Sequence, residues 1–406
     1  MIFDKTIADQ VAESSNRGYW SVNNKVYFFN KFETLKYATD VKSDQIKYHY
    51  FDDFYKNLNW HIEPSESLNE LYQRRAQNLR DKYEYLILLF SGGADSSNAL
   101  HSFVDNGIHL DEVITSYPKT LLKKLLPSFD RNNKFHGNSA FEYFEAALPR
   151  LQWLSKNHPN VKITDIDATQ TALQLVTTGK MSELSHSGFP PVIPIVGTYI
   201  PAYLRAREIF DQGKKICWIT GNDKPRILYN PKEKIFKTYW QDISFTHGAL
   251  DNHALSGFKP TVENFYYNQD IVEITLKQCA LIKKALIPIF RHQDLSVINA
   301  QNLIQSVTER GNYVIDVHHD FIKKILYPQW DTSIFQAEKP ENQGHGDGNG
   351  YQYYYSGLLD KNLLDHAWGQ IRDWYGAINE NLLVKDRFNR SRERMYATDA
   401  ITLKFS

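Results

Sequence analysis

Seven consecutive residues combine features that binding of an anion requires. Two adjacent glycines let the main chain turn tightly and approach a ligand closely. The serines on either side supply hydroxyl donors. The run reads SGGADSS and comprises Ser91, Gly92, Gly93, Ala94, Asp95, Ser96 and Ser97.

The flanking segments place this run between a strand and a helix. Tyr85–Phe90 is a short apolar stretch bounded by turn residues, which is typical of a strand buried on both faces. Downstream, Ala99, Leu100 and Phe103 follow helical spacing. The unpaired amides of the first helical turn and the positive end of its dipole would then face a ligand above the loop. An ordinary glycine turn without a ligand is the alternative.

The SGGADSS run resembles the SGGxDS signature of the N-type ATP pyrophosphatases, or PP-loop superfamily. That superfamily includes the synthetase domains of asparagine synthetase, GMP synthetase and argininosuccinate synthetase. Its loop holds the pyrophosphate of ATP while a substrate oxygen attacks the α-phosphate. A Walker A loop is excluded because no Gly-Lys-Ser/Thr follows, and a GxSxG nucleophile elbow is excluded because no serine lies between spaced glycines.

The resemblance implies an α/β fold with a Rossmann-like parallel sheet and helices on both faces. It implies ATP and Mg²⁺ as cofactors, the seven-residue loop as the nucleotide site, and Asp95 as a magnesium ligand and catalytic residue. In the superfamily the tip of the second strand contacts adenine and ribose. That strand is predicted at Glu112–Thr115, so Ser116 and Tyr117 are the candidates here.

A second polar loop, GNDKPR, follows the strand predicted at Lys215–Thr220. Charged residues at the carboxyl end of a buried parallel strand lie on the ligand-binding rim of the sheet. Gly221 is assigned to the nucleotide site, and Asp223 could help hold magnesium. Lys224 or Arg226 could neutralise departing pyrophosphate. The residues of this loop differ from those at the corresponding loop of asparagine synthetase. The alternative to a functional loop is a polar turn that carries the chain out of the sheet.

Three segments are expected along the chain. They are a small N-terminal α+β segment over 1–75, the nucleotide-binding α/β domain over 76–235 and a mainly helical substrate or lid domain over 236–406. In the first segment, Asn23 and Asn24 separate two short runs as in a β-hairpin. A loop covering the site is predicted at His186–Thr198. Helices are predicted at Ile271–Phe290, Ser296–Thr308 and Phe321–Tyr327.

Composition narrows the classes of function. The 47 basic residues balance the 47 acidic residues, so no global field steers the protein toward nucleic acid or an anionic membrane. Cys217 and Cys279 are too far apart in sequence for a CxxC zinc site. No signal peptide and no apolar run of membrane-spanning length is found. We expect a cytoplasmic protein without a membrane partner, and the oligomeric state stays open.

The leading hypothesis is an AMP-forming C–N ligase. It would adenylate a carboxylate or carbonyl oxygen of a small-molecule or nucleobase substrate and release pyrophosphate, and a nitrogen nucleophile would then displace AMP. Glutamine-dependent asparagine synthetases carry a cysteine after the initiator methionine, whereas Ile2 stands here, so we expect another nitrogen source. The alternatives are modification of a nucleobase in tRNA or DNA and ATP binding without turnover. The lack of paired cysteines argues against sulfur transfer.

Overall fold

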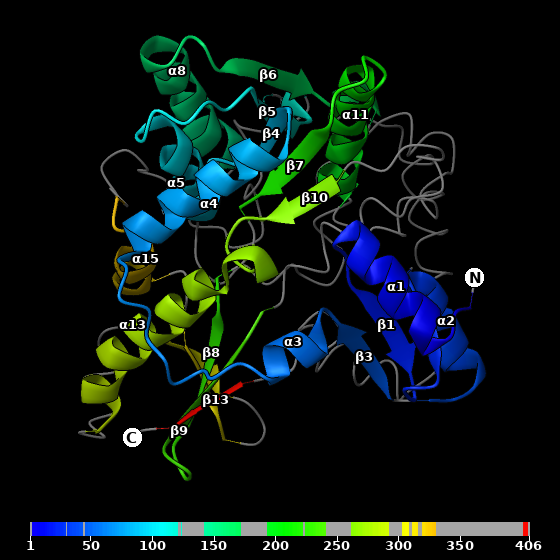
Figure 1. Cartoon of the computed structure of the whole chain (residues 1–406), viewed down its shortest axis with the longest axis vertical. Coiled ribbons are helices and arrows are strands. Elements are labelled where there is room, and N and C mark those ends of the chain that lie inside the picture. The colour runs from blue at the N-terminus through cyan, green and yellow to red at the C-terminus, as the bar shows by residue number, and fades with distance from the viewer. Residues whose placement is uncertain are drawn as a thin grey trace.

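A parallel sheet flanked by helices lies at the centre of the computed structural model (Figure 1). The structure describes residues 2–29, 31–43, 45–120, 123, 142–171, 193–221, 224–240, 261–291, 303–307, 311–315, 319–329 and 401–404. Within these ranges the strands form three sheets, with the orders β2-β1-β3, β10-β7-β4-β5-β6 and β11-β12-β8-β9-β13.

The parallel sheet has β4 as its middle strand. β4 (Tyr85–Leu89) lies between β7 (Ile216–Thr220) and β5 (Glu112–Tyr117), while β10 (Thr261–Asn264) and β6 (Lys162–Asp167) form the edges. Each neighbouring pair of strands is parallel. The strands predicted around the SGGADSS loop and before GNDKPR are confirmed as β4, β5 and β7.

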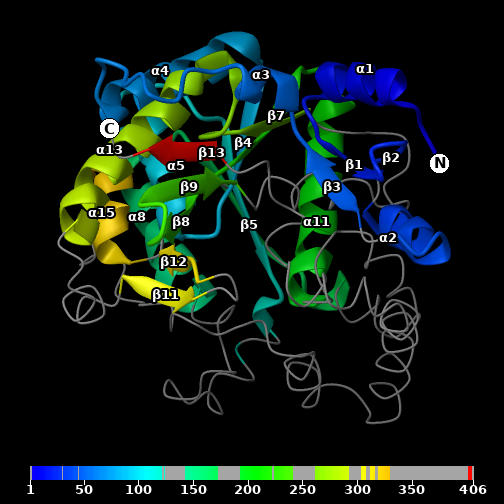
Figure 2. The same ribbon diagram turned by 90° about the horizontal axis from the view of Figure 1, so that it is seen from below.

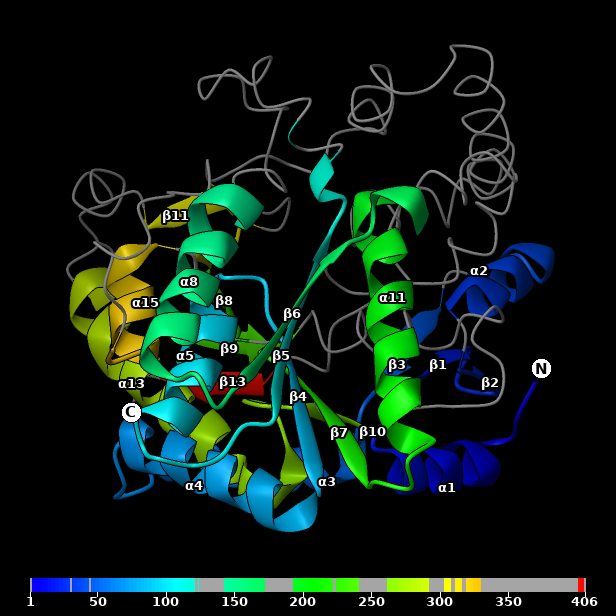
Figure 3. The ribbon, with the colours of Figure 1, turned by 90° about the horizontal axis from the view of Figure 1, so that it is seen from above.

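Helices cover both faces of this sheet (Figure 3). One face carries α4 (Leu68–Lys82), α5 (Ala94–Val104) and α8 (Leu148–Asn157), and the other carries α11 (Ile193–Phe210). A capping box fixes the start of α4, because Ser67 accepts from the amide of Glu70 and the Glu70 carboxylate accepts from the amide of Ser67.

Alternate residues of β4 contribute to two separate cores. Leu86 and Leu88 pack in the cluster that contains Phe103 of α5, whereas Ile87 packs in the cluster that contains Ala206 of α11. Successive side chains of a strand point to opposite faces, so a continuous apolar run is what a strand covered on both sides requires. The predicted α/β architecture with a parallel sheet is confirmed.

The N-terminal segment is a small antiparallel sheet surrounded by helices. Asn23 and Asn24 have φ of 56° and 53°, and the amide of Lys25 donates to the carbonyl of Val22 across this turn. The predicted hairpin is therefore confirmed. The elements are α1 (Lys5–Ser15), β1 (Tyr19–Val22), β2 (Val26–Phe28), α2 (Lys31–Asp40), β3 (Ile46–His49) and α3 (Asp52–Lys56).

A second antiparallel sheet, which was not predicted, lies beside α13 (Figure 2). Phe290 of α13 packs against Tyr229 and Phe236 of this sheet, with ring centroids 4.5 and 5.6 Å apart. The strands of this sheet are β8 (Arg226–Asn230), β9 (Ile235–Tyr239), β11 (Ile304–Val307), β12 (Tyr313–Ile315) and β13 (Ile401–Lys404). The same part of the chain also contains the 3₁₀ turn η5 (Gln269–Ile271) and the helices α13 (Val272–Arg291) and α15 (Asp320–Leu326).

Several expectations for the second half of the chain need correction. Helices are confirmed near 271–290 and 321–327, but the helix predicted over 296–308 is wrong at 304–307, where pairing with β12 makes a strand. The loop predicted over 186–198 is wrong from residue 193, because α11 begins there and tolerates Pro194 in its first turn. The boundary expected at 235 falls at the start of β9, and β10 returns to the parallel sheet.

Candidate active site

The SGGADSS loop joins the carboxyl end of β4 to α5. Gly92 has a φ of +77°, and a Cβ there would lie 2.4 Å from the backbone nitrogen of Ala147. Ala147 ends the π-helical turn η2 (Glu142–Ala147), which leads into α8. Both the dihedral angle and the close approach exclude a side chain, so glycine is required for the loop to pack against this turn.

The amino end of α5 is arranged as an anion-binding end. Gly93 is the N-cap residue and gives the helix no side-chain hydrogen bond. Among the described residues, only Ser91 Oγ would come within 4 Å of a Cβ built on Gly93. The first amides of an α-helix lack intrahelical acceptors and carry the positive end of the dipole. A phosphate group placed over Ala94 and Gly93 would meet these donors.

Serine hydroxyls hold the loop through long hydrogen bonds. Ser91 Oγ lies 3.3 Å from Ser96 Oγ and accepts from the amide of Gly93 at 3.4 Å. Ser97 Oγ donates to the carbonyl of Gly92 at 3.4 Å. Hydroxyl hydrogen bonds are usually 2.5–3.0 Å long. These contacts are therefore at the long end of the hydrogen-bond range.

Asp95 and Lys224, assigned separately from sequence, are brought together. Lys224 Nζ lies 2.7 and 2.9 Å from the two carboxylate oxygens of Asp95. The side chain of Lys224 is 6% exposed and that of Asp95 is 29% exposed. A lysine ammonium thus lies beside the first turn of α5, where it adds positive charge next to the anion-binding end.

Close packing of β7 against α5 brings Lys224 to this position. A Cβ on Gly221 would lie 2.6 Å from Ser96 Cα, so the residue after β7 touches the first turn of α5 directly. Arg226 does not lie in an irregular loop as expected, because it is the first residue of β8 and is paired with Tyr239. Asp223, the second candidate magnesium ligand, lies outside the described residues.

The tip of β5 reaches the same loop. Tyr117 OH lies 3.5 Å from the carbonyl oxygen of Ser91, and its ring is 5.4 Å from that of Tyr143 in η2. Ser116 lies on the opposite face of the strand, and its buried Oγ has no hydrogen-bond partner in the described part of the chain. Tyr117 is thereby placed beside the loop, and Ser116 retains an unused donor and acceptor.

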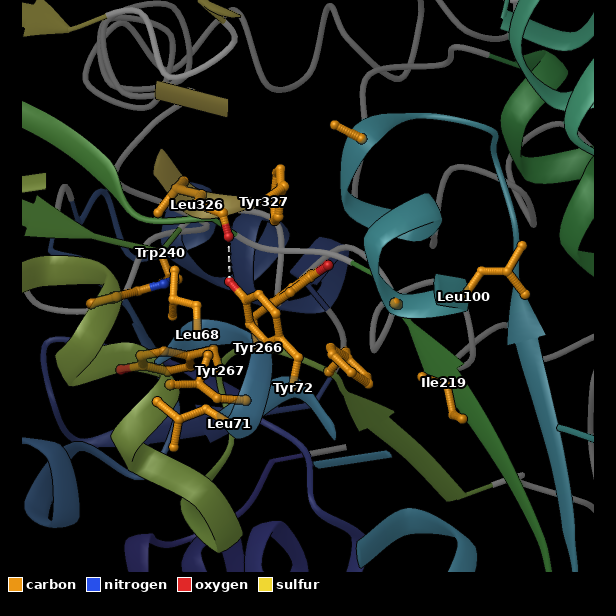
Figure 4. Close-up of a cluster of buried hydrophobic side chains, with 14 of the residues drawn as sticks. Leu68, Leu71, Tyr72, Leu100, Ile219, Trp240, Tyr266, Tyr267, Leu326 and Tyr327 are labelled. Carbon is orange, nitrogen blue, oxygen red and sulfur yellow. Dashed lines mark hydrogen bonds between the residues drawn. The ribbon is translucent and has the colours of Figure 1, made fainter. Parts of the chain in front are cut away.

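Two buried tyrosines also contact Asp95. Tyr266 OH donates to the main-chain oxygen of Asp95 at 2.6 Å, and Tyr327 OH donates to its Oδ1. Figure 4 shows these two rings next to Tyr72. Burial, followed by the negative charge of Asp95, raises the pKa of Tyr327 well above its usual value. Tyr327 is therefore protonated and donating near neutral pH.

Tyr327 was missed from sequence. It lies 232 residues beyond Asp95, in no recognisable motif, and the pattern around it indicated only a helix. Tyr266 is fully buried and follows strand β10, again outside both motifs. Neither position carried a local signal, because each acts through a contact that exists only in the folded chain.

Ser21, His49 and Asp52 form an arrangement with the residue types of a hydrolase triad. Ser21 Oγ lies 2.7 Å from His49 Nε2, and His49 Nδ1 lies 2.8 Å from Asp52 Oδ2. Ser21 is 0% exposed, however, and His49 is stacked on Tyr19 with centroids 4.9 Å apart. A nucleophile must reach its substrate. This arrangement is therefore a buried hydrogen-bond network of the N-terminal sheet.

The donor set around the loop fits a triphosphate with its metal ion. Amides at the start of α5, serine hydroxyls and Lys224 are all groups that hold phosphate oxygens. A carboxylate has about four lone-pair sites, and the partial exposure of Asp95 leaves room for contact with Mg²⁺. No cluster of three or more metal-ligating side chains occurs in the described ranges. Phosphate and water would therefore complete the magnesium shell, as is usual for this ion.

Comparisons with known proteins give no relatives: no family model, no curated protein and no solved structure matches the chain. Among the described residues, no helix is both long enough and apolar enough to cross a membrane.

Proposed function

We propose that the protein is an ATP pyrophosphatase of the PP-loop type. It adenylates a carboxylate or carbonyl oxygen of its substrate and releases pyrophosphate. A nitrogen nucleophile then displaces AMP and forms a C–N bond. ATP and Mg²⁺ are the proposed cofactors.

The observation that supports this proposal most directly is the position of the open helix end. The loop follows the middle strand of a parallel sheet, at the carboxyl edge where α/β proteins bind ligands. Backbone atoms of Ala147 lie directly against Gly92, and those of Ser96 lie directly against Gly221. Packing of the surrounding main chain therefore holds the anion-binding amides in a fixed geometry, which is what electrostatic stabilisation of phosphoryl-type transfer requires.

The chain's own residues have separable tasks in this proposal. The amides of the first turn of α5, with Ser91, Ser96 and Ser97, bind the β- and γ-phosphates. Lys224 neutralises the charge that develops on pyrophosphate as the bond to the α-phosphate breaks. Asp95 would hold Mg²⁺, which supplies charge neutralisation across the phosphate oxygens when it is bound. Tyr117, beside Ser91, would contact the nucleoside.

The identity of the released group tests the proposal. ATP labelled at the α-phosphate is incubated with Mg²⁺, ammonia or amines, and panels of carboxylates, nucleosides and RNA. We expect labelled AMP with equimolar pyrophosphate, and Lys224→Gln should lower the rate by about 100-fold, as loss of one stabilising charge does. Lys215→Gln, at an exposed lysine next to β7, is the matched control and should be neutral.

Other products would separate the alternatives. Labelled ADP would contradict the proposed chemistry. Nucleotide binding without any pyrophosphate over the whole panel would favour a non-catalytic ATP-binding protein. Activity confined to the RNA arm would favour nucleobase modification.

A further inference from the structure

We propose that Tyr327 is a positioning residue that fixes the Asp95 carboxylate for metal-nucleotide binding. This inference rests on the proposed function, since it assigns Asp95 to Mg²⁺. It adds a residue from the end of α15, far from both sequence motifs. The proposal is based on the contacts that Lys224 and Tyr327 make with the Asp95 carboxylate.

Two different donors meet Asp95 Oδ1. Lys224 Nζ lies 2.9 Å from this atom, and Tyr327 OH donates to it as well, whereas Oδ2 is 2.7 Å from the same ammonium. An ion pair that spans both oxygens sets little preference among rotations of the carboxylate about its own axis. The hydroxyl of Tyr327 adds a directional contact at one oxygen and restricts that rotation.

The chemical nature of the donor matters. Lys224 already compensates the charge of Asp95, so a second cation there would add net positive charge and repel Mg²⁺. A neutral hydroxyl orients the carboxylate and leaves the charge balance unchanged. A tyrosine hydroxyl, with an ordinary pKa of about 10, is neutral near pH 7. Tyr327 is thus suited to aim the carboxylate without competing electrostatically for the metal.

Tyr327 is itself held by a chain of hydrogen bonds. Tyr72 OH donates to the carbonyl oxygen of Leu326 at 2.6 Å, the dashed line of Figure 4, and Gln278 Nε2 donates to Tyr72 OH at 3.0 Å. Tyr327 is 1% exposed and its ring lies 5.6 Å from that of Tyr266. Helices α4 and α13 therefore fix the residue that in turn fixes Asp95.

Binding of a non-hydrolysable ATP analogue, αβ-methylene ATP, tests this role without turnover. Calorimetry measures its affinity with and without Mg²⁺ for wild type, Tyr327→Phe and Tyr55→Phe. Tyr55 is a matched control, because its hydroxyl is buried without a hydrogen-bond partner among the described residues. We expect Tyr327→Phe to lower the Mg²⁺-dependent gain in affinity by about tenfold, the value of one hydrogen bond to a charged group. Metal-free binding should match wild type.

Kinetics and thermal melting give independent readouts. The magnesium concentration for half-maximal pyrophosphate release should rise for Tyr327→Phe, with kcat lower and the KM for ATP nearly unchanged, while Tyr55→Phe behaves as wild type. Equal magnesium dependence in Tyr327→Phe and wild type would overturn the inference and leave the proposed function standing. A lower melting temperature without a magnesium effect would also overturn it, since that is a purely structural role. Failure of wild type to bind the analogue would overturn both proposals.

Discussion

Asp95 and Glu263 are two carboxylates in contact with cationic side chains, yet their surroundings differ. Glu263 in β10 is 0% exposed, and Asp95 at the start of α5 is 29% exposed. Glu263 accepts five hydrogen bonds, two on Oε1 and three on Oε2. The donors are Lys82, Tyr83, Arg75, Asn16 and Asn268.

The comparison sets a carboxylate that holds parts of the fold together beside one that the proposed function assigns to Mg²⁺. The donors to Glu263 come from the N-terminal segment, from α4 and its C-cap residue, and from the turn after β10. This carboxylate therefore joins parts of the fold and is saturated with donors. Asp95 is instead partly exposed at the amino end of α5. Both carboxylates are ion-paired, so what distinguishes Asp95 from Glu263 is its partial exposure beside the first turn of α5.

The largest effect is expected from removing the charge of Glu263. Glu263→Gln would remove the nearer carboxylate partner of Arg75, which is fully buried, and leave Asp270 at 3.8 Å. Breaking a buried pair on one side typically costs about 3–5 kcal/mol, so we expect a loss of that size in the free energy of unfolding. Urea unfolding of the variant measures it. Glu208→Gln, whose side chain is 64% exposed, is the control and should change stability by less than about 0.5 kcal/mol.

Glu263 should also account for part of the loss of stability at acidic pH. Burial raises the pKa of Glu263, but the charge of Arg75 and hydrogen bonds from Tyr83 and Lys82 outweigh it and lower the pKa from 4.5 to about 2. A depressed folded-state pKa means that the stabilisation is complete above pH 4.5 and is lost as the pH falls toward 2. Unfolding free energies between pH 6 and about 2.5 should fall more steeply for wild type than for Glu263→Gln. Parallel curves would contradict the assignment.

Sequence analysis identified Asp95 as a candidate site residue but gave no indication of the buried network around Glu263. The reason is physical. The Asp95 loop, β4 and the start of α5 are contiguous, so strand pattern, glycine pair and helix spacing all fall within one short stretch. The partners of Glu263 extend from Asn16 to Asn268, and only the folded sheet brings them together. The pairing of Asp95 with Lys224 was likewise invisible, although each residue was singled out. Strand β11 was misassigned because its partner β12 decides its conformation.

We expect Asp95→Asn to have a large effect on activity and a small effect on stability, whereas the main effect expected for Glu263→Gln is on stability. The amide keeps the shape of the side chain but loses its charge toward Lys224 and the metal ion. We expect pyrophosphate release to fall by about 100-fold or more, with a stability cost of about 1–2 kcal/mol because the pair is partly solvated. Steady-state rates and urea unfolding measure the two effects. Asp81→Asn, at an exposed position of α4, serves as the control. A stability loss as large as that of Glu263→Gln, with activity intact, would make Asp95 structural too.

The smallest effects are expected from removing a single hydroxyl donor at each carboxylate, Tyr83 at Glu263 and Tyr327 at Asp95. This pair of variants is also the most direct test of the comparison. Tyr83 OH donates to Glu263 Oε1 at 2.6 Å, and Lys82 Nζ donates to the same atom at 2.9 Å. Because Lys82 remains, we expect Tyr83→Phe to cost about 1.5 kcal/mol of stability and to leave pyrophosphate release within twofold of wild type. Tyr327→Phe should instead alter magnesium dependence. If Tyr83→Phe also shifts that dependence, the two carboxylates are coupled through the sheet and the distinction between them fails.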